Sequence, residues 1–185
     1  MQTTPKNNFK FSLKFFFGII LCLLVRLIPF RAPNVEPILA TTMPFSRAYG
    51  ALTGFSFAVL SILLYDIITH TLGVQTLFTA GAYGVLGLWA AYYFKKNKEK
   101  KWGYVSFAVI GTLFFDAVTG LTVGPIFFHQ SFMQSLIGQI PFTALHLISN
   151  VAFALILSPA IYNLLVRKKN PKIISSINIL NPKTI

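Results

Sequence analysis

Two aspartates stand in closely similar apolar surroundings. Asp66 lies near the end of residues 56–69, and Asp116 holds the same place in residues 106–119, where half of the fourteen aligned positions are identical. A carboxylate inside an apolar helix is costly unless a cation, a hydrogen-bond donor or water compensates it. The two aspartates are therefore the first candidates for a polar binding site, and the repeat indicates duplicated helical hairpins.

A second set of polar side chains follows one face of the last apolar segment. Gln139, Thr143, His146 and Asn150 recur at intervals of four, three and four residues, which is helical spacing. Such a stripe must face protein or a water-filled cavity. Two interpretations fit it equally: hydrogen bonds between helices, or the wall of a pocket whose floor is closed by Asn150.

Other ionisable groups can reach the aspartates. Asp66 and His70 are four residues apart, and they share a helix face if the helix extends that far. Arg26 can neutralise either aspartate in a structural ion pair. The alternatives for Arg26 are a direct contact with a solute and an extended position at the membrane interface.

Metal and enzyme chemistry are not indicated. Carboxylates and imidazoles together suit transition metals, but the sequence has neither an HxH nor an HExxH spacing. It also lacks a nucleophile elbow, a phosphate-binding loop and the paired carboxylates of a hydrolase. We therefore expect no catalytic residues, no metal site and no cofactor.

The composition is that of an integral membrane protein. Hydrophobic residues make up 55% of the 185 positions, charged residues 11%, and the mean hydropathy is +0.67, whereas soluble domains carry about 25% charged residues. This length allows about six or seven membrane crossings. The net charge of +12 comes mostly from lysines clustered outside the apolar segments, which is typical of anchors in the cytoplasm rather than of nucleic-acid binding.

The basic clusters predict the topology. They lie at residues 6–14, 95–101 and 167–172 and should all face the cytoplasm, so an even number of crossings must separate them. The apolar segments run over residues 15–30, 35–46, 49–68, 75–94, 105–118 and 140–166. The second would rise only about 18 Å, but an even number of crossings requires that it span the membrane.

An all-α integral membrane fold follows from these segments. We expect six transmembrane helices arranged as three hairpins with both termini cytoplasmic. Residues 1–14 form a basic cytoplasmic N-terminus, residues 15–166 the membrane domain, and residues 167–185 a basic cytoplasmic tail without order. Residues 121–139 are expected to form a cap or re-entrant piece at the outer surface.

In this topology the polar side chains gather in the outer half of the membrane, and each hairpin contributes some of them. Three hairpins that aim polar groups at one outward-facing region build a pocket for a solute. The predicted solute-binding residues are Arg31, Glu36, Asp66, Asp116, His129 and His146, with Asn150 at the floor.

Three stretches resemble a known group of membrane proteins. Residues 31–37 (RAPNVEP), 64–66 (LYD, followed by Thr69) and 139–146 (QIPFTALH, followed by Ser149 and Asn150) are similar to those of substrate-binding S components of energy-coupling factor (ECF) transporters. The similarity covers roughly residues 15–166.

The resemblance implies a function and a set of partners. It implies a protein of the cell membrane that captures a vitamin or another micronutrient from outside, docked to a transmembrane coupling protein and two cytoplasmic ATPases. Members of the group dock through small residues on the first helix, which Gly18 and Cys22 approximate here. Two other functions fit the sequence: a membrane scaffold or assembly protein that transports nothing, and a secondary transporter or channel that acts alone.

Overall fold

The computed structural model describes residues 5–30, 34–96 and 102–166. These residues form six α-helices, a terminal π-helical turn and no strand, so the predicted all-α fold is confirmed. The elements are α1 (Pro5–Arg26), α2 (Ile38–Tyr49), α3 (Ala51–Ile68), α4 (Val74–Lys96), α5 (Trp102–Phe127), α6 (Phe132–Ile161) and η1 (Tyr162–Val166).

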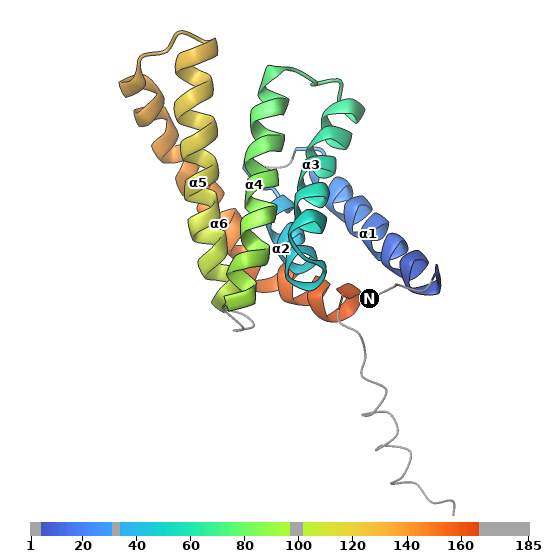
Figure 1. The fold of residues 1–185 in the computed structure, drawn as a ribbon. Coiled ribbons are helices and arrows are strands. Elements are labelled where there is room, and N and C mark those ends of the chain that lie inside the picture. The colour runs from blue at the N-terminus through green and yellow to red at the C-terminus, as the bar shows by residue number, and fades with distance from the viewer. Residues whose placement is uncertain (1–4, 31–33, 97–101, 167–185) are drawn as a thin grey trace, which may run out of the picture.

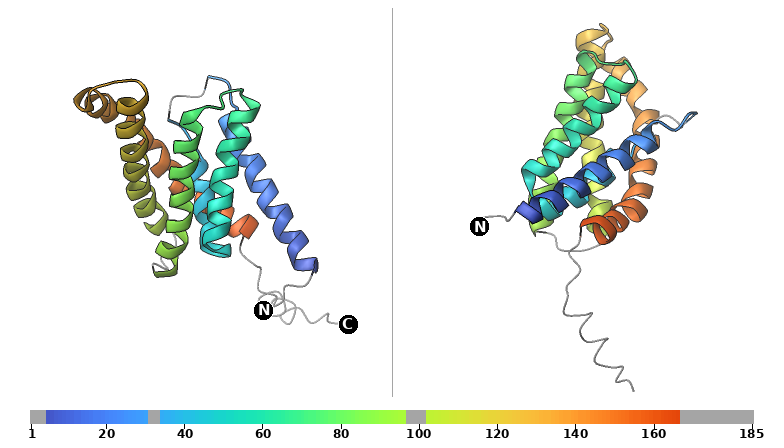
Figure 2. Two further views of the ribbon diagram at one scale, coloured as in Figure 1. Left: turned by 45° about the horizontal axis from the view of Figure 1, so that its top comes forward. Right: turned by 90° about the vertical axis from the view of Figure 1, so that its right-hand side faces the viewer.

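Successive helices run in alternating directions, and they form three consecutive pairs, called here the first, second and third hairpins (Figure 1). The start of α1, the end of α4 at Lys96 and the end of η1 lie at one end of the molecule, called here the lysine end (Figure 2). Among the described helices, α3, α4, α5 and the continuous α6–η1 are long and apolar enough to cross a membrane.

The short helix α2 lies at the centre of the molecule. Its first nine residues, Ile38 to Ser46, are all buried, and it contacts each of the other five α-helices. The predicted short segment is therefore a helix. At twelve residues it rises about 18 Å, so it is an inner element covered by longer helices.

Pro44 interrupts the hydrogen bonding of α2. Because proline has no N–H, the carbonyl of Ala40, four residues earlier, loses its usual helical donor. Ser158 of α6 supplies a replacement, since its hydroxyl donates to the Ala40 oxygen at 2.8 Å and is itself fully buried. A contact between residues 118 positions apart thus completes the hydrogen bonds of the central helix.

Small residues let α3 and α4 approach closely. A Cβ atom added to Gly87 would lie 2.4 Å from the backbone of Gly54, and one added to Gly54 would lie 2.6 Å from the Gly87 oxygen. A Cβ atom added to Gly84 would lie 2.8 Å from the Phe55 ring. These glycines pack one helix of the second hairpin directly on the other.

The predicted outer cap at residues 121–139 is wrong. Helix α5 continues to Phe127 and α6 begins at Phe132, so the connection is residues 128–131 alone. Gly120 lies inside α5, and a glycine fits there because α6 passes close to it. A Cβ atom at this position would lie 1.9 Å from Gln139 Oε1. Ser131 and Gln134 form a capping box that begins α6.

The sequence repeat is visible in the helices that carry it. Asp66 lies fifteen residues after the start of α3, and Asp116 fourteen after the start of α5. The two helices differ at their far ends, since α3 stops two residues after its aspartate and α5 eleven residues after. Asp116 is therefore inside a long helix, and the predicted end of this segment at residue 118 is wrong.

Candidate functional site

A polar cavity of about 340 Å³ lies between the three hairpins, toward the end opposite the lysine end. It reaches from the exposed Thr71 and Gln75 near the α3–α4 turn to the buried His146 of α6. Its lining residues are Arg26, Asn34 and Glu36 from the first hairpin; Ile62, Asp66, Thr71, Gln75, Thr79 and Tyr83 from the second; and Phe115, Thr119, Phe142 and His146 from the third.

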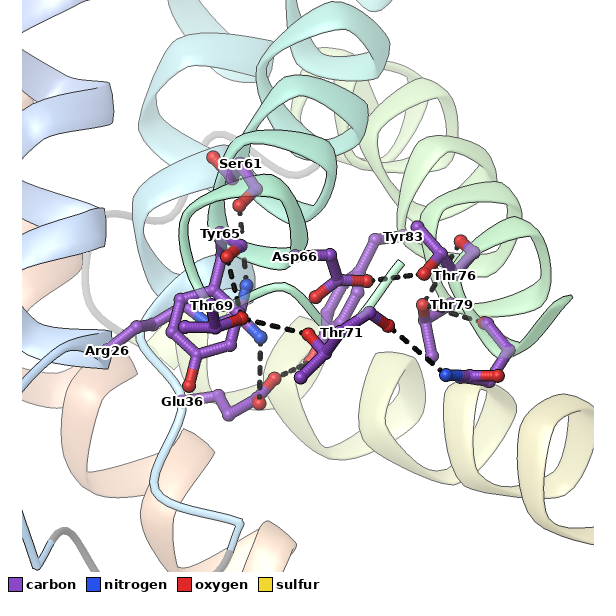
Figure 3. A network of polar contacts seen from close by, with 11 residues as sticks. Arg26, Glu36, Ser61, Tyr65, Asp66, Thr69, Thr71, Thr76, Thr79 and Tyr83 are labelled. Atoms are coloured by element: carbon purple, nitrogen blue, oxygen red, sulfur yellow. Dashed lines mark hydrogen bonds and ion pairs between the residues drawn. The ribbon is translucent and has the colours of Figure 1, made fainter. Parts of the chain in front are cut away.

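Asp66 enters the cavity from the last turn of α3. Its Oδ2 accepts a hydrogen bond of 2.6 Å from the hydroxyl of Thr76, at the start of α4 (Figure 3). No cationic side chain in the described part of the chain lies within ion-pair distance of it. Asp66 is half-buried, so its carboxylate is exposed to whatever fills the cavity.

Arg26 pairs with Glu36, so the predicted ion pair between Arg26 and an aspartate is wrong. One guanidinium nitrogen donates to Glu36 Oε1 at 3.3 Å, and the other donates to the Ser61 carbonyl at 3.3 Å. The guanidinium carbon lies 3.7 Å from the centre of the Tyr65 ring, and Figure 3 shows Arg26 beside this ring. Tyr83 donates to the second oxygen of Glu36 at 3.3 Å. Together these contacts link the first hairpin to the second.

Asp116 and His146 form a buried pair at the deep end of the cavity. Asp116 Oδ1 accepts from His146 Nδ1 at 2.7 Å, and the side chains are 2% and 3% exposed respectively. His146 lines the cavity, with Asp116 directly behind it. Within the described residues, Asp116 Oδ2 and His146 Nε2 have no hydrogen-bond partner. The rings of Phe115 and Phe142 stand edge-on to the imidazole at 5.6 and 5.9 Å.

The polar residues along α6 serve both of the roles predicted for them, hydrogen bonding between helices and lining of a pocket. His146 lines the cavity, whereas Asn150 is buried one turn deeper and donates to Thr112 of α5 at 2.8 Å. Gln139 packs on Gly120 and contacts Thr143 at 3.4 Å. Hydrogen bonding between helices thus accounts for Asn150, and the pocket wall for His146.

The structure brings together only part of the predicted site. Glu36, Asp66 and His146 line one cavity, and Asp116 contacts it through His146. Asn150 lies beneath the cavity. Two predicted residues lie away from the cavity: His129 is exposed in the turn after α5, and His70 lies beyond the end of α3. Arg31 is outside the described residues.

The predicted docking strip on the first helix faces the protein interior. Gly18 is buried against Phe45 and Phe57, where an added Cβ atom would lie 2.6 and 3.0 Å from the rings. Cys22 is fully buried in the core. Because α2 and α3 cover these small residues, they are buried within the chain in this structure, and a docking role for them stays a prediction.

Sequence reasoning missed the wall that α4 contributes. Thr76, Thr79 and Tyr83 recur at helical spacing, and they hold Asp66, line the cavity and bind Glu36 respectively. This stripe of hydroxyl groups on an apolar helix was available as a signal. Threonine and tyrosine are less costly in a membrane than charged residues, which makes such a stripe less conspicuous.

Comparisons of the chain with protein-family models, with curated proteins and with solved structures find no match. In the described residues, no three His, Cys, Asp or Glu side chains gather closely enough to hold a metal ion. What the cavity offers chemically is a set of carboxylates, hydroxyls, amides and aromatic rings, suited to reversible binding of a small molecule.

Proposed function

We propose that this chain is the solute-binding membrane subunit of an ATP-driven importer of the ECF type, and that it captures a micronutrient from outside the cell. The cavity between the three hairpins carries the proposal. Its volume of about 340 Å³ is within the range of small-molecule sites. Its polar side chains come from every hairpin and converge on one space, which supports binding of a single solute.

The proposal includes an orientation in the cell membrane. All six helices cross, with α2 completed by its flanking residues, and both termini lie in the cytoplasm. The positions of Lys95 and Lys96 at the end of α4 support this, because lysines concentrate on the cytoplasmic side. The cavity lies near the opposite ends of α3 and α4 and would open outward. A transmembrane coupling protein and two cytoplasmic ATPases would supply the energy for transport.

A second candidate is a membrane scaffold that binds no solute. It is favoured by the internal partners of the charged groups, since Arg26 pairs with Glu36 and Asp116 with His146. Ion pairs of this kind hold helices together without any ligand. Asp66 distinguishes the two functions, because it has no cationic partner in the described residues and its carboxylate borders the cavity.

The test is the identification of a bound small molecule. The full chain is purified in detergent, and metabolites that co-purify are extracted and identified by mass spectrometry. We expect one compound at a near-stoichiometric level in the wild-type protein and its loss in Asp66→Ala. Glu99→Gln is the matched control, because it removes the one carboxylate that belongs to the lysine-rich segment at residues 95–101.

Two results would contradict the proposal. A wild-type protein that retains no compound, even after purification in native lipid discs, supports the scaffold. A compound whose level is unchanged in both Asp66→Ala and Asp116→Ala binds somewhere other than this cavity. Size-exclusion chromatography of each variant shows whether a loss of binding reflects a loss of folding.

A further inference from the structure

Three of the four acidic residues in this strongly basic chain meet at one cavity. The chain has a net charge of +12, yet Glu36 and Asp66 line the cavity and Asp116 stands directly behind its deepest wall. Among the described residues that line the cavity, Arg26 is the one arginine or lysine, and Glu36 neutralises it.

The sign of the remaining charge does not depend on how His146 is protonated. If His146 is protonated, the pair it forms with Asp116 is neutral, and if it is not, the pair carries a negative charge. Asp66 adds one further negative charge in both cases. The described residues of the cavity therefore carry net negative charge in surroundings where an uncompensated charge is expensive, which favours a solute that brings a positive charge.

The hydroxyl groups that line the cavity already donate their hydrogen bonds to acceptors within the protein. Thr79 donates to the Gln75 carbonyl at 2.9 Å, and Thr119 donates to the Phe115 carbonyl at 2.8 Å. Thr69 donates to the Tyr65 carbonyl, so in its contact of 2.8 Å with Thr71 the donor must be Thr71. What Thr71, Thr79 and Thr119 offer a solute is therefore their oxygen lone pairs.

Acceptors also dominate among the other polar groups of the cavity. Tyr83 donates its proton to Glu36. The unpaired oxygen of Asp66 accepts, and so does Nε2 of a neutral His146 whose Nδ1–H is bound to Asp116. The amides of Asn34 and Gln75 can serve as either donor or acceptor. A solute that satisfies these groups must carry several N–H donors.

Aromatic rings supply the remaining walls. Tyr83 and Phe115 pack together with ring centres 4.2 Å apart, and Phe142 stands beside His146. Aromatic faces attract organic cations and also accept flat apolar rings. A bare inorganic cation would leave these surfaces unused.

We propose that the solute is a small organic cation rich in N–H donors, such as an amidine or a protonated amino-heterocycle. Its charged group binds Asp66, and its ring lies among Tyr83, Phe115 and Phe142. The inference rests on the proposed function, since it assumes that the cavity binds a solute, and it goes further by assigning the sign of the charge and the hydrogen-bonding character of that solute.

The test uses three probes of one shape and different charge: benzamidine is a cation, benzamide is neutral and benzoate is an anion. Binding to the purified full chain is measured by saturation-transfer NMR, which detects weak binding. We expect saturation transfer to benzamidine and little or none to benzamide or benzoate. An amidinium places two parallel N–H donors against a carboxylate, and charge-assisted hydrogen bonds of this kind are the stronger ones.

The matched variants are Asp66→Asn and Glu99→Gln. The amide introduced by Asp66→Asn keeps the size of the side chain and an oxygen that can accept from Thr76, so the variant removes charge while preserving the local hydrogen bond. We expect benzamidine to bind Asp66→Asn at least about tenfold more weakly, in line with the loss of one charge-assisted hydrogen bond. Glu99→Gln should bind benzamidine as the wild type does.

The outcomes separate this inference from the proposed function. If benzamide or benzoate binds as well as benzamidine, or if none of the three binds, the cavity is not a site for an aromatic cation and the inference is overturned. The same holds if Asp66→Asn and the wild type bind benzamidine equally. The proposed function fails on a different observation, the absence of any co-purifying solute. A co-purifying solute that proves to be neutral or anionic supports the proposed function and overturns the inference.

Discussion

Asp66 and Asp116 hold the same place in a repeated sequence, yet their surroundings give them different roles. Asp66 ends a helix at the border of the cavity and is half-buried. Asp116 lies within a helix, is buried and orients His146. The repeat therefore contains two carboxylates, and the different lengths of α3 and α5 determine which of them borders the cavity directly.

This difference leads to a stability prediction. Asp116→Ala removes the only described partner of His146 Nδ1 and leaves a buried polar group unsatisfied, so we expect a loss of about 1–3 kcal/mol in the free energy of unfolding. Asp66→Ala, at a half-exposed site, should cost less than about 1 kcal/mol. The measurement is SDS-induced unfolding in mixed micelles. Equal losses in the two variants would contradict the different roles assigned to these aspartates.

The pair formed by Arg26 and Glu36 allows a second test at this scale. Glu36→Gln leaves the buried guanidinium without its counter-charge, and Arg26→Met leaves the carboxylate without its own. A double-mutant cycle should therefore show that the double variant loses less free energy of unfolding than the sum of the two single losses. The expected coupling is about 1–2 kcal/mol. A coupling near zero would mean that solvent screens this pair and that the contact is not structural.

The sequence alone could predict several of the ionisable residues that belong to the site. Buried charges are rare enough in an apolar chain that Glu36, Asp66, Asp116 and His146 stand out by type alone. Their partners could not be predicted in the same way. Arg26 lies ten residues from Glu36, but the link between α1 and α2 brings those two together, and its conformation is not encoded in any periodic pattern.

At the scale of elements, helix α2 depends on a hydrogen bond from α6. Ser158→Ala removes the donor that serves the Ala40 carbonyl, and because that carbonyl is buried, we expect a loss of about 1–3 kcal/mol. Pro44→Ala restores the backbone N–H at that place. The cost of Ser158→Ala should therefore be smaller in the Pro44→Ala background, as SDS-induced unfolding of the four proteins would show.

A control exists within α3. Ser61→Ala removes a buried hydroxyl that donates to the Phe57 carbonyl at 2.8 Å, but the backbone N–H four residues later serves the same carbonyl. We expect this variant to lose clearly less stability than Ser158→Ala. If the two losses are equal, the special position of Ser158 opposite Pro44 is contradicted.

The contact between α3 and α4 gives a prediction with a matched pair of glycines. Gly87→Ala places a Cβ atom 2.4 Å from the backbone of Gly54, where no flexible side chain can move aside, and overpacking of this kind costs about 1–3 kcal/mol. Gly81→Ala, on the same helix, meets nothing within 4 Å and should be neutral or slightly stabilising because alanine favours helices. Thermal unfolding in detergent distinguishes them, and equal melting temperatures would contradict the close approach.

Helix positions were predictable from apolar runs, whereas their ends were not. The segments predicted at residues 49–68 and 75–94 match α3 and α4 closely. The prediction failed after Asp116, because the predicted segment ends at residue 118 whereas α5 continues through Gly120, Gly124 and Pro125 to Phe127. In soluble proteins these residues often break helices. Here the glycines face Gln139 and Ser135 of α6, so a close helix pair explains them.

At the scale of the whole molecule, the described helices form three hairpins, and the other five α-helices surround the short helix α2. The requirement for an even number of crossings between the basic clusters predicted three hairpins and a helix at the short second segment. It could not show that α2 is covered by every other α-helix, because the apolar composition of a membrane protein does not distinguish a surface that faces lipid from one that faces protein. The membrane orientation remains a prediction, and it determines whether the cavity opens outward.

Cysteine accessibility tests that orientation directly. The native Cys22 is buried and is the one cysteine of the chain, so Cys22→Ala gives a background without thiols. Leu72→Cys and Phe128→Cys place exposed thiols in the α3–α4 and α5–α6 connections, and Lys96→Cys places one at the end of α4. In intact cells a membrane-impermeant maleimide should label the first two and leave the third unlabelled, because lysine-rich ends stay in the cytoplasm. All three should react in permeabilised cells. Labelling of position 96 alone would place the cavity on the cytoplasmic side, and a solute captured from outside would then have no route to Asp66.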